Sequence, residues 1–97
     1  MIPENLILGL GSRLNIRILK SLTDNLDKEL TIEGMAKDLK IDYSTAFRHL
    51  EKLCDAGYFT FDYENKELKA IKTYYLKDEI KDNKKLIDFI QSIQLHE

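Results

Sequence analysis

The side chains best suited to recognition chemistry lie in one short segment, residues 43–55. Arg48 carries a guanidinium group that can donate two parallel hydrogen bonds to O6 and N7 of a guanine base. Neighbouring hydroxyl groups can donate to phosphates or base edges, and an aromatic ring can contact a thymine methyl group. The candidate contacts to double-stranded DNA in this segment are Tyr43, Ser44, Thr45, Phe47, Arg48 and Lys52.

Other kinds of chemistry lack the residues that they need. Gly9-Leu10-Gly11 is an isolated fragment of a glycine-rich phosphate-binding motif, so we interpret it as a helix break. Cys54 is the only cysteine, which rules out an intramolecular disulfide and indicates a reducing, intracellular setting. No nucleophile with a nearby histidine can be assembled, and the terminal region offers only His96 beside Glu97. We therefore expect no enzyme activity, no cofactor and no bound metal.

Helices must position these residues, because apolar side chains recur with a period of 3.6 residues over three segments. Each segment follows a candidate N-cap residue, namely Ser12, Thr31 and Asp42. The predicted helices span about residues 12–22, 32–39 and 43–55. Only a very short turn joins the last two helices, which is typical of a helix-turn-helix. His49 borders the apolar face of the third helix and is expected to be structural, while Glu51 and Asp55 lie on its outer face.

The next part of the chain favours strands. Aromatic and β-branched residues dominate residues 58–63 and 70–76, and the polar residues between them predict a hairpin. Residues 29–31 are a candidate for a very short additional strand. Helical spacing returns over residues 78–95, and residues 1–10 predict a short N-terminal helix.

The predicted fold class is α+β and mostly α, a winged helix-turn-helix with a two-stranded wing and a long C-terminal dimerisation helix. We expect one domain over residues 1–97, consisting of an N-terminal helix, a core and the terminal helix, at residues 1–10, 12–76 and 78–95. A chain of 97 residues with 43% hydrophobic and 33% charged residues suits one ordered core. No apolar run approaches the roughly 18 residues needed to span a bilayer.

The sequence of the third helix resembles a known family. The residues that carry the resemblance are Ser44-Thr45-Ala46-Phe47-Arg48-His49-Leu50, then Leu53 and Ala56-Gly57-Tyr58-Phe59. They resemble the recognition helix of arsenic-repressor-like (ArsR-type) winged-helix regulators, which commonly reads S-T-x-x-R-H-L-x-x-L-x-x-A-G-L. The resemblance covers roughly residues 10–76. It implies a transcriptional regulator whose helix over residues 43–55 enters the major groove, with the wing over residues 58–76 on the flanking backbone.

Cations outside this helix are expected to contact phosphates. Lys66 lies at the predicted hairpin tip, with Lys69 and Lys72 behind it, and Arg13 lies at the start of the first core helix. Acidic and basic side chains balance from residue 36 to residue 72, so this surface attracts DNA less strongly than is typical of the family.

The terminal helix is expected to form the interface of a homodimer. Its apolar residues span about half of its circumference, which is wider than a helix lying on its own domain needs. The predicted interface residues are Leu6, Ile80, Leu86, Ile87, Phe89, Ile90 and Ile93.

Two hypotheses follow from the sequence. The first is a cytoplasmic, sequence-specific regulator that binds double-stranded DNA as a homodimer. The second is a winged-helix module that binds protein instead of DNA, which the net charge of −2 favours. The lysine-rich and isoleucine-rich composition further suggests an archaeal or archaeal-viral source.

Overall fold

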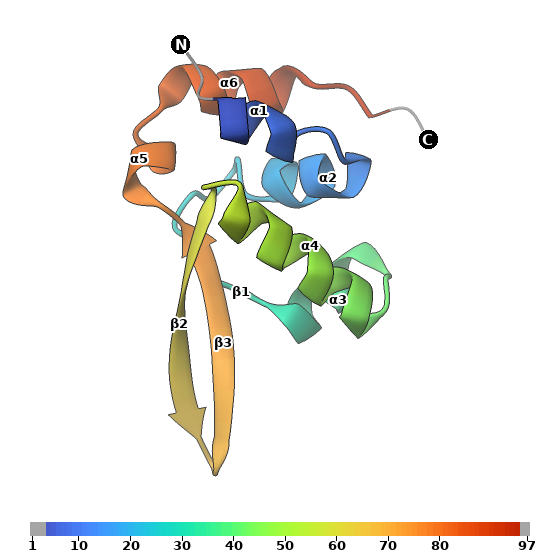
Figure 1. Ribbon diagram of the computed structural model, residues 1–97, viewed down its shortest axis with the longest axis vertical. Helices are drawn as coiled ribbons and strands as arrows, with labels where there is room; N and C mark the ends of the chain where they lie inside the picture. Colours follow the sequence, from blue (N-terminus) through green and yellow to red (C-terminus); the bar gives the residue numbers. More distant parts are fainter. Residues whose placement is uncertain (1–3, 96–97) are drawn as a thin grey trace.

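The structure, a computed structural model, describes residues 4–95 except for the side chain of Lys66. Its elements follow the predicted order over most of the chain (Figure 1). They are α1 (Glu4–Gly9), α2 (Arg13–Ser21), β1 (Leu30–Thr31), α3 (Ile32–Leu39), α4 (Tyr43–Asp55), β2 (Phe59–Lys66), β3 (Lys69–Leu76), α5 (Asp78–Lys81) and α6 (Lys84–Ser92). Among these helices none is long and apolar enough to cross a membrane.

The helices begin where the sequence predicts because polar side chains cap their free N–H groups. Ser12 Oγ accepts a hydrogen bond from the backbone N–H of Asn15 at 3.4 Å. Thr31 Oγ1 likewise accepts from the N–H of Gly34 at 3.0 Å. A Cβ atom at Gly34 would lie only 2.9 Å from Thr31 Oγ1, so a larger residue there would force this cap to shift. Asp42 occupies the N-cap position of α4 but makes no side-chain capping bond.

The three strands form an antiparallel sheet in the order β1-β3-β2. β2 and β3 pair along their whole length, from Phe59 opposite Leu76 to Lys66 opposite Lys69. The very short strand that the sequence offered over residues 29–31 is present as β1, which pairs with β3 at the base of the hairpin, where Leu30 lies opposite Tyr74. Beyond that base the hairpin projects away from the helices as a wing (Figure 1).

The core draws on every helix and strand, and its buried apolar side chains form a contiguous cluster. Its members are Leu6, Ile18, Leu19, Leu22, Leu30, Ile32, Met35, Ala46, Leu50, Leu53, Tyr58, Phe59, Tyr74, Leu76, Ile80, Leu86, Ile87 and Ile90. Burial of this apolar surface is the main stabilising term of the fold.

The prediction of one long C-terminal helix is wrong. The segment forms two short helices, α5 and α6, separated at Asp82 and Asn83. Asn83 leaves the helical conformation, and its Oδ1 accepts a hydrogen bond from the backbone N–H of Leu86 at 3.1 Å. Asparagine favours an N-cap over a helix interior because its short side chain competes for nearby backbone groups.

This break changes which apolar side chains remain free. Five residues that the sequence assigned to a dimer interface are instead buried in the chain's own core, namely Leu6, Ile80, Leu86, Ile87 and Ile90. The three of these residues that belong to α6 are buried because the turn between α5 and α6 lets α6 pack on α2. Of the predicted interface residues, Phe89 is 48% exposed and Ile93 is half-buried.

The end of α6 is tied to α2 by Lys20. Its ammonium group donates to the backbone carbonyl of Gln91 at 3.2 Å and also to that of Ile93. A lysine at the carboxyl end of a helix satisfies carbonyls that lack an intrahelical partner and interacts favourably with the helix dipole. Lys20 therefore fixes the C-terminal segment onto the core.

Replacing Lys20 with methionine should lower the free energy of unfolding by about 1 kcal/mol, because the bonds to the two carbonyls are lost while the aliphatic stem is retained. Urea denaturation would measure the change. Lys28→Met, in the exposed loop before β1, is the matched control and should leave the midpoint unchanged. Equal midpoints for the two variants would contradict this role of Lys20.

Candidate nucleic-acid interface

The buried face of α4 determines which of its side chains reach solvent. Ala46, Leu50 and Leu53 are fully buried, and their spacing places them on one side of the helix. Two further rows of side chains, each with a spacing of four residues, run along the exposed part of α4. We call Ser44, Arg48 and Lys52 the polar line, and Tyr43 and Phe47 the aromatic pair.

A buried polar contact fixes α4 against α2. His49 Nδ1 lies 2.8 Å from Asn15 Oδ1, and Asn15 Nδ2 donates to the carbonyl of Gly9 at 3.0 Å. Because the amide oxygen of Asn15 can only accept, His49 donates through Nδ1. Burial lowers the pKa of His49, and the charges of Lys52 and Arg48 lower it further, so the imidazole is neutral at physiological pH. His49 is therefore structural, as its position in the sequence predicts.

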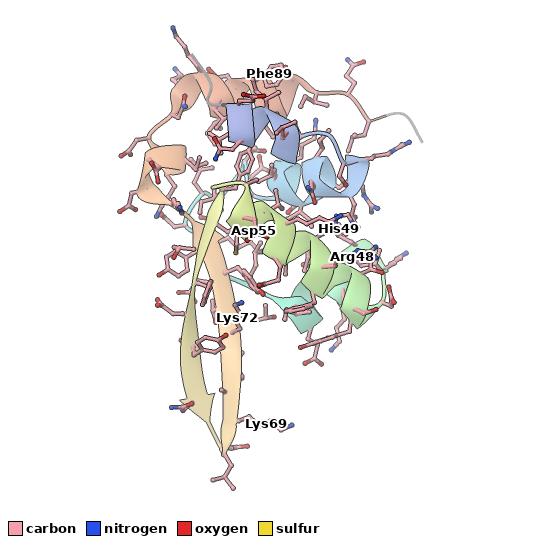
Figure 2. All side chains as sticks on the ribbon, viewed as in Figure 1. Arg48, His49, Asp55, Lys69, Lys72 and Phe89 are labelled. Carbon is pink, nitrogen blue, oxygen red and sulfur yellow. The ribbon has the colours of Figure 1, made fainter. Side chains whose placement is uncertain are left out.

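All three side chains of the polar line are exposed. Arg48 extends from α4 toward solvent near the amino-terminal end of the helix (Figure 2). The two cations lie one helical turn apart, so they can contact a base and a phosphate, or two phosphates, at the same time.

Two arginines of α2 lie beside the turn of the helix-turn-helix. Arg13 and Arg17 line a shallow groove of about 420 Å³ together with Ile41, which lies in the turn between α3 and α4. Arg13, predicted to contact phosphate, is exposed at the start of α2.

The hydroxyl groups at the start of α4 are occupied within the chain. Ser44 Oγ donates a hydrogen bond to Asp42 Oδ2 at 2.9 Å. The hydroxyl of Thr45 and that of Ser44, in this order of strength, lower the pKa of Asp42. An anion at this end of α4 is also favoured by the helix dipole. Ser44 and Thr45 therefore complete the helix N-terminus, and would donate a hydrogen bond to DNA only by giving up Asp42 as acceptor.

The sequence predicted that Glu51 lies on the outer face of α4, but in the structure its carboxylate contacts β3 of the wing. Its Oε2 accepts hydrogen bonds from Lys72 Nζ at 2.6 Å and from the Tyr74 hydroxyl at 2.5 Å. Lys72 Nζ also lies 3.9 Å from the centre of the Phe61 ring, a cation–π contact. Lys72 was predicted to follow phosphates, but these contacts occupy it instead.

This cluster joins α4 to β3 by charge. Burial would raise the pKa of Glu51, but the hydrogen bonds from Lys72 and Tyr74 and the charge of Lys72 together lower it. Burial would lower the pKa of Lys72, but the bond to Glu51 raises it. The pair is therefore ionised at neutral pH. The strand period indicates that Lys72 and Tyr74 share one face of β3, but it does not identify Glu51 as the residue that they meet.

The wing contributes one described cation near its tip. Lys69 is exposed at the start of β3 (Figure 2). The side chain of Lys66, the other predicted wing contact, lies outside what the structure describes. Asp55 is exposed at the opposite end of α4 from the aromatic pair (Figure 2).

Metal and redox chemistry find little support in the described part of the chain. Residues 4–95 contain no group of three or more histidine, cysteine, aspartate or glutamate side chains that could hold a metal ion. His96 and Glu97 lie outside the described residues. Burial raises the pKa of Cys54 to about 11, so its thiol is protonated and unreactive at neutral pH.

Comparison with known families identifies a helix-turn-helix domain. Residues 14–59, which run from α2 to the start of β2, match the arsR family of bacterial regulatory proteins. Regulators of this family bind DNA to control transcription and are generally not enzymes. No curated protein matches the chain significantly.

Several solved structures share the fold. A possible transcriptional regulator from Methanosarcina mazei Go1 superposes with a TM-score of 0.68 and 21% identity, over 90% of this chain and 74% of that one. HlyU from Vibrio cholerae N16961 superposes with a TM-score of 0.61 and 20% identity, over 90% of this chain and 82% of HlyU. A putative transcription factor from Pseudomonas aeruginosa superposes with a TM-score of 0.64 and 17% identity, over 94% of this chain and 68% of that one. At these identities the likeness establishes the fold.

Replacing Glu51 with glutamine should destabilise the protein by about 1 kcal/mol at pH 7, because the partly buried Lys72 loses its anion. Since folding lowers the pKa of Glu51, its contribution is complete above the unfolded-state pKa of about 4.3 and is lost as pH falls through the folded-state pKa. The difference between wild type and variant should therefore shrink below about pH 4.5.

Urea denaturation at several pH values would measure this difference. Glu33→Gln removes an exposed carboxylate whose nearest oxygen lies 3.7 Å from Lys37, and it should change stability by less than about 0.5 kcal/mol. A Glu51→Gln variant as stable as wild type at pH 7 would show that the cluster contributes nothing.

Proposed function

We propose that this chain, whose residues 14–59 match the arsR family, is a sequence-specific regulator of transcription that binds double-stranded DNA as a homodimer. In this proposal the chain acts as one winged-helix domain. α4 enters the major groove, and the wing lies along the flanking backbone. The observation that carries the proposal is the exposed polar line of α4, presented beside a projecting wing.

The dimensions and chemistry of α4 suit this role. The major groove is about 12 Å wide and admits an α-helix, whose amino-terminal half then meets the base edges. Arg48 lies in that half and can read guanine, while Lys52, one turn further on, can reach a phosphate. The fixed contact between His49 and Asn15 holds this face outward.

The net charge of −2 is only weak evidence against binding of nucleic acid, because it does not say where the charges lie. Glu51 of α4 is four residues from Phe47, and Lys72 neutralises its charge within the chain. Arg48 and Lys52 are exposed cations on α4, and Lys69 is an exposed cation of the wing. Because exposed charges are screened beyond about 8 to 10 Å at moderate salt, this local arrangement matters more than the total.

Exposed apolar side chains support a dimer at the other end of the molecule. Ile7 and Leu8 of α1 are 53% and 71% exposed, and Phe89 of α6 is 48% exposed. Both helices lie at the end opposite the wing tip (Figure 1). A second copy could bury these side chains while leaving both α4 helices free for a pseudo-palindromic site with half-sites about 34 Å apart.

The remaining parts of the proposal follow from the proposed role and the composition. A regulator of this kind acts in the cytoplasm, where prokaryotic DNA lies. The lysine-rich and isoleucine-rich sequence supports an archaeal or archaeal-viral source. We propose that DNA binding requires no metal or other cofactor.

Arg48→Ala should weaken binding to the preferred duplex by about 1 to 3 kcal/mol and broaden the preferred sequence, because a bidentate base contact is lost. Lys69→Ala should instead weaken binding to all sequences about equally and reduce the salt slope by about one unit. Site selection from a random duplex pool, followed by mobility-shift titration, distinguishes the two effects. Lys28→Ala, far from α4 in the sequence, is the control.

Failure of the wild-type protein to shift any duplex at about 50 mM salt would contradict the proposed function and favour a protein partner. If Arg48→Ala has the same site preference as wild type, Arg48 of α4 does not recognise bases.

Leu8→Asp should convert the dimer into a monomer, because it places a charge in the proposed apolar interface. Sedimentation velocity at micromolar concentration would measure the change. Leu68→Asp is the matched control, since Leu68 is fully exposed at the wing tip and its replacement should leave the dimer intact. A monomeric wild-type protein, or a dimeric Leu8→Asp variant, would refute this interface.

A further inference from the structure

The aromatic pair of α4 is unusual for a helix with a solvated outer face. Tyr43 is 59% exposed and Phe47 is 43% exposed. The two rings lie four residues apart, so they are neighbours on one side of the helix. Large apolar rings held in water contribute little to folding, which suggests that they serve recognition.

No other ring in the described part of the chain covers the pair. The exposed rings of the wing have partners, since Phe61 meets Tyr63 edge to face with ring centres 5.7 Å apart and also contacts Lys72. Tyr43 and Phe47 make no such ring or cation contact within residues 4–95. Tyr43 instead borders an open groove of about 510 Å³ that Lys69 and Ile71 of the wing also line.

We propose that Tyr43 and Phe47 recognise A·T base pairs through the C5-methyl groups of thymine. The inference rests on the proposed function, because it requires the amino-terminal half of α4 to enter the major groove. Thymine presents there the only apolar group of any unmodified base edge. Phe47 has no hydrogen-bonding atom, so contact with a methyl group is favourable, whereas contact with the amino group of cytosine would strip it of water.

The spacing of the pair specifies how many base pairs it reads. Side chains four residues apart on a helix have Cβ atoms about 5 to 6 Å apart. Successive base pairs are separated by about 3.4 Å along the duplex, so the pair spans one or two steps. Each half-site should therefore contain two thymines close together, next to the guanine that Arg48 reads.

Charge favours DNA over an apolar protein surface as the occupant. The aromatic pair lies beside the polar line, which carries Arg48 and Lys52, whereas Lys69 of the wing and Glu33 of α3 both line the groove that Tyr43 borders. A protein surface apolar enough to cover the rings would also bury Arg48 without an anion, which is costly. A duplex supplies phosphates to the cations and methyl groups to the rings in the same contact.

The test replaces single thymines of the best selected duplex with deoxyuridine, which pairs identically with adenine but lacks the methyl group. Burial of one methyl-sized group is worth about 0.8 kcal/mol, or about a fourfold change in the dissociation constant. In each half-site we expect two thymines at which a single replacement by deoxyuridine weakens wild-type binding about fourfold. The unmodified duplex, which carries thymine at those positions, is the internal control.

Double-mutant cycles assign each methyl group to a ring. In Phe47→Ala one sensitive position should lose its response to deoxyuridine, and in Tyr43→Ala the other should. Leu68→Ala removes an exposed apolar side chain outside α4 and should keep both responses. Circular dichroism verifies that each variant is folded. The deoxyuridine series on wild-type protein tests the inference even if a variant does not fold.

The outcomes separate this inference from the proposed function. If wild type selects a site but deoxyuridine has no effect at any thymine, the inference is wrong while the proposed function stands. Sensitivity that persists in both Phe47→Ala and Tyr43→Ala would also overturn it. If wild type binds no duplex at all, the proposed function fails and the inference fails with it.

Discussion

The hydrogen bond between His49 and Asn15 sets the rotation of α4, and the exposed surface of the domain depends on that rotation. Ala46, Leu50 and Leu53 would still be buried if α4 turned slightly about its axis, because packing of aliphatic side chains is not directional. A buried polar pair has one satisfied geometry, and leaving either partner unpaired costs about 1 to 3 kcal/mol. Since Asn15 also binds the carbonyl of Gly9, the same contact extends from α4 through α2 to the end of α1.

A second directional contact fixes the wing relative to α4. The ion pair of Glu51 with Lys72, supported by the Tyr74 hydroxyl, crosses from α4 to β3. The ring of Phe61 covers the ammonium group of Lys72 and so limits its exchange with water. The pair removes two charges from the proposed DNA-binding face. Arg48 and Lys52 of the polar line and Lys69 near the wing tip are exposed cations on that face.

Local signals in the sequence predicted the parts of the fold that depend on nearby residues. The bounds of α4 and the caps at Ser12 and Thr31 follow from side chains within one helical turn. The break at Asn83 was missed because the apolar spacing continues across it, although the asparagine itself was a sufficient signal. The cluster around Glu51 depends on how α4 meets β3, a contact between residues 21 to 23 positions apart that helix periodicity does not encode.

The central claim is that α4 presents Arg48 to base edges in the major groove. Dimethyl sulfate footprinting tests it most directly, because the reagent methylates guanine at N7, the atom that Arg48 would contact. We predict that wild-type protein protects one guanine in each half-site and that Arg48→Ala, bound to saturation on the same duplex, leaves both guanines reactive. Guanines that stay reactive under bound wild-type protein, or that remain protected by Arg48→Ala, would contradict this account.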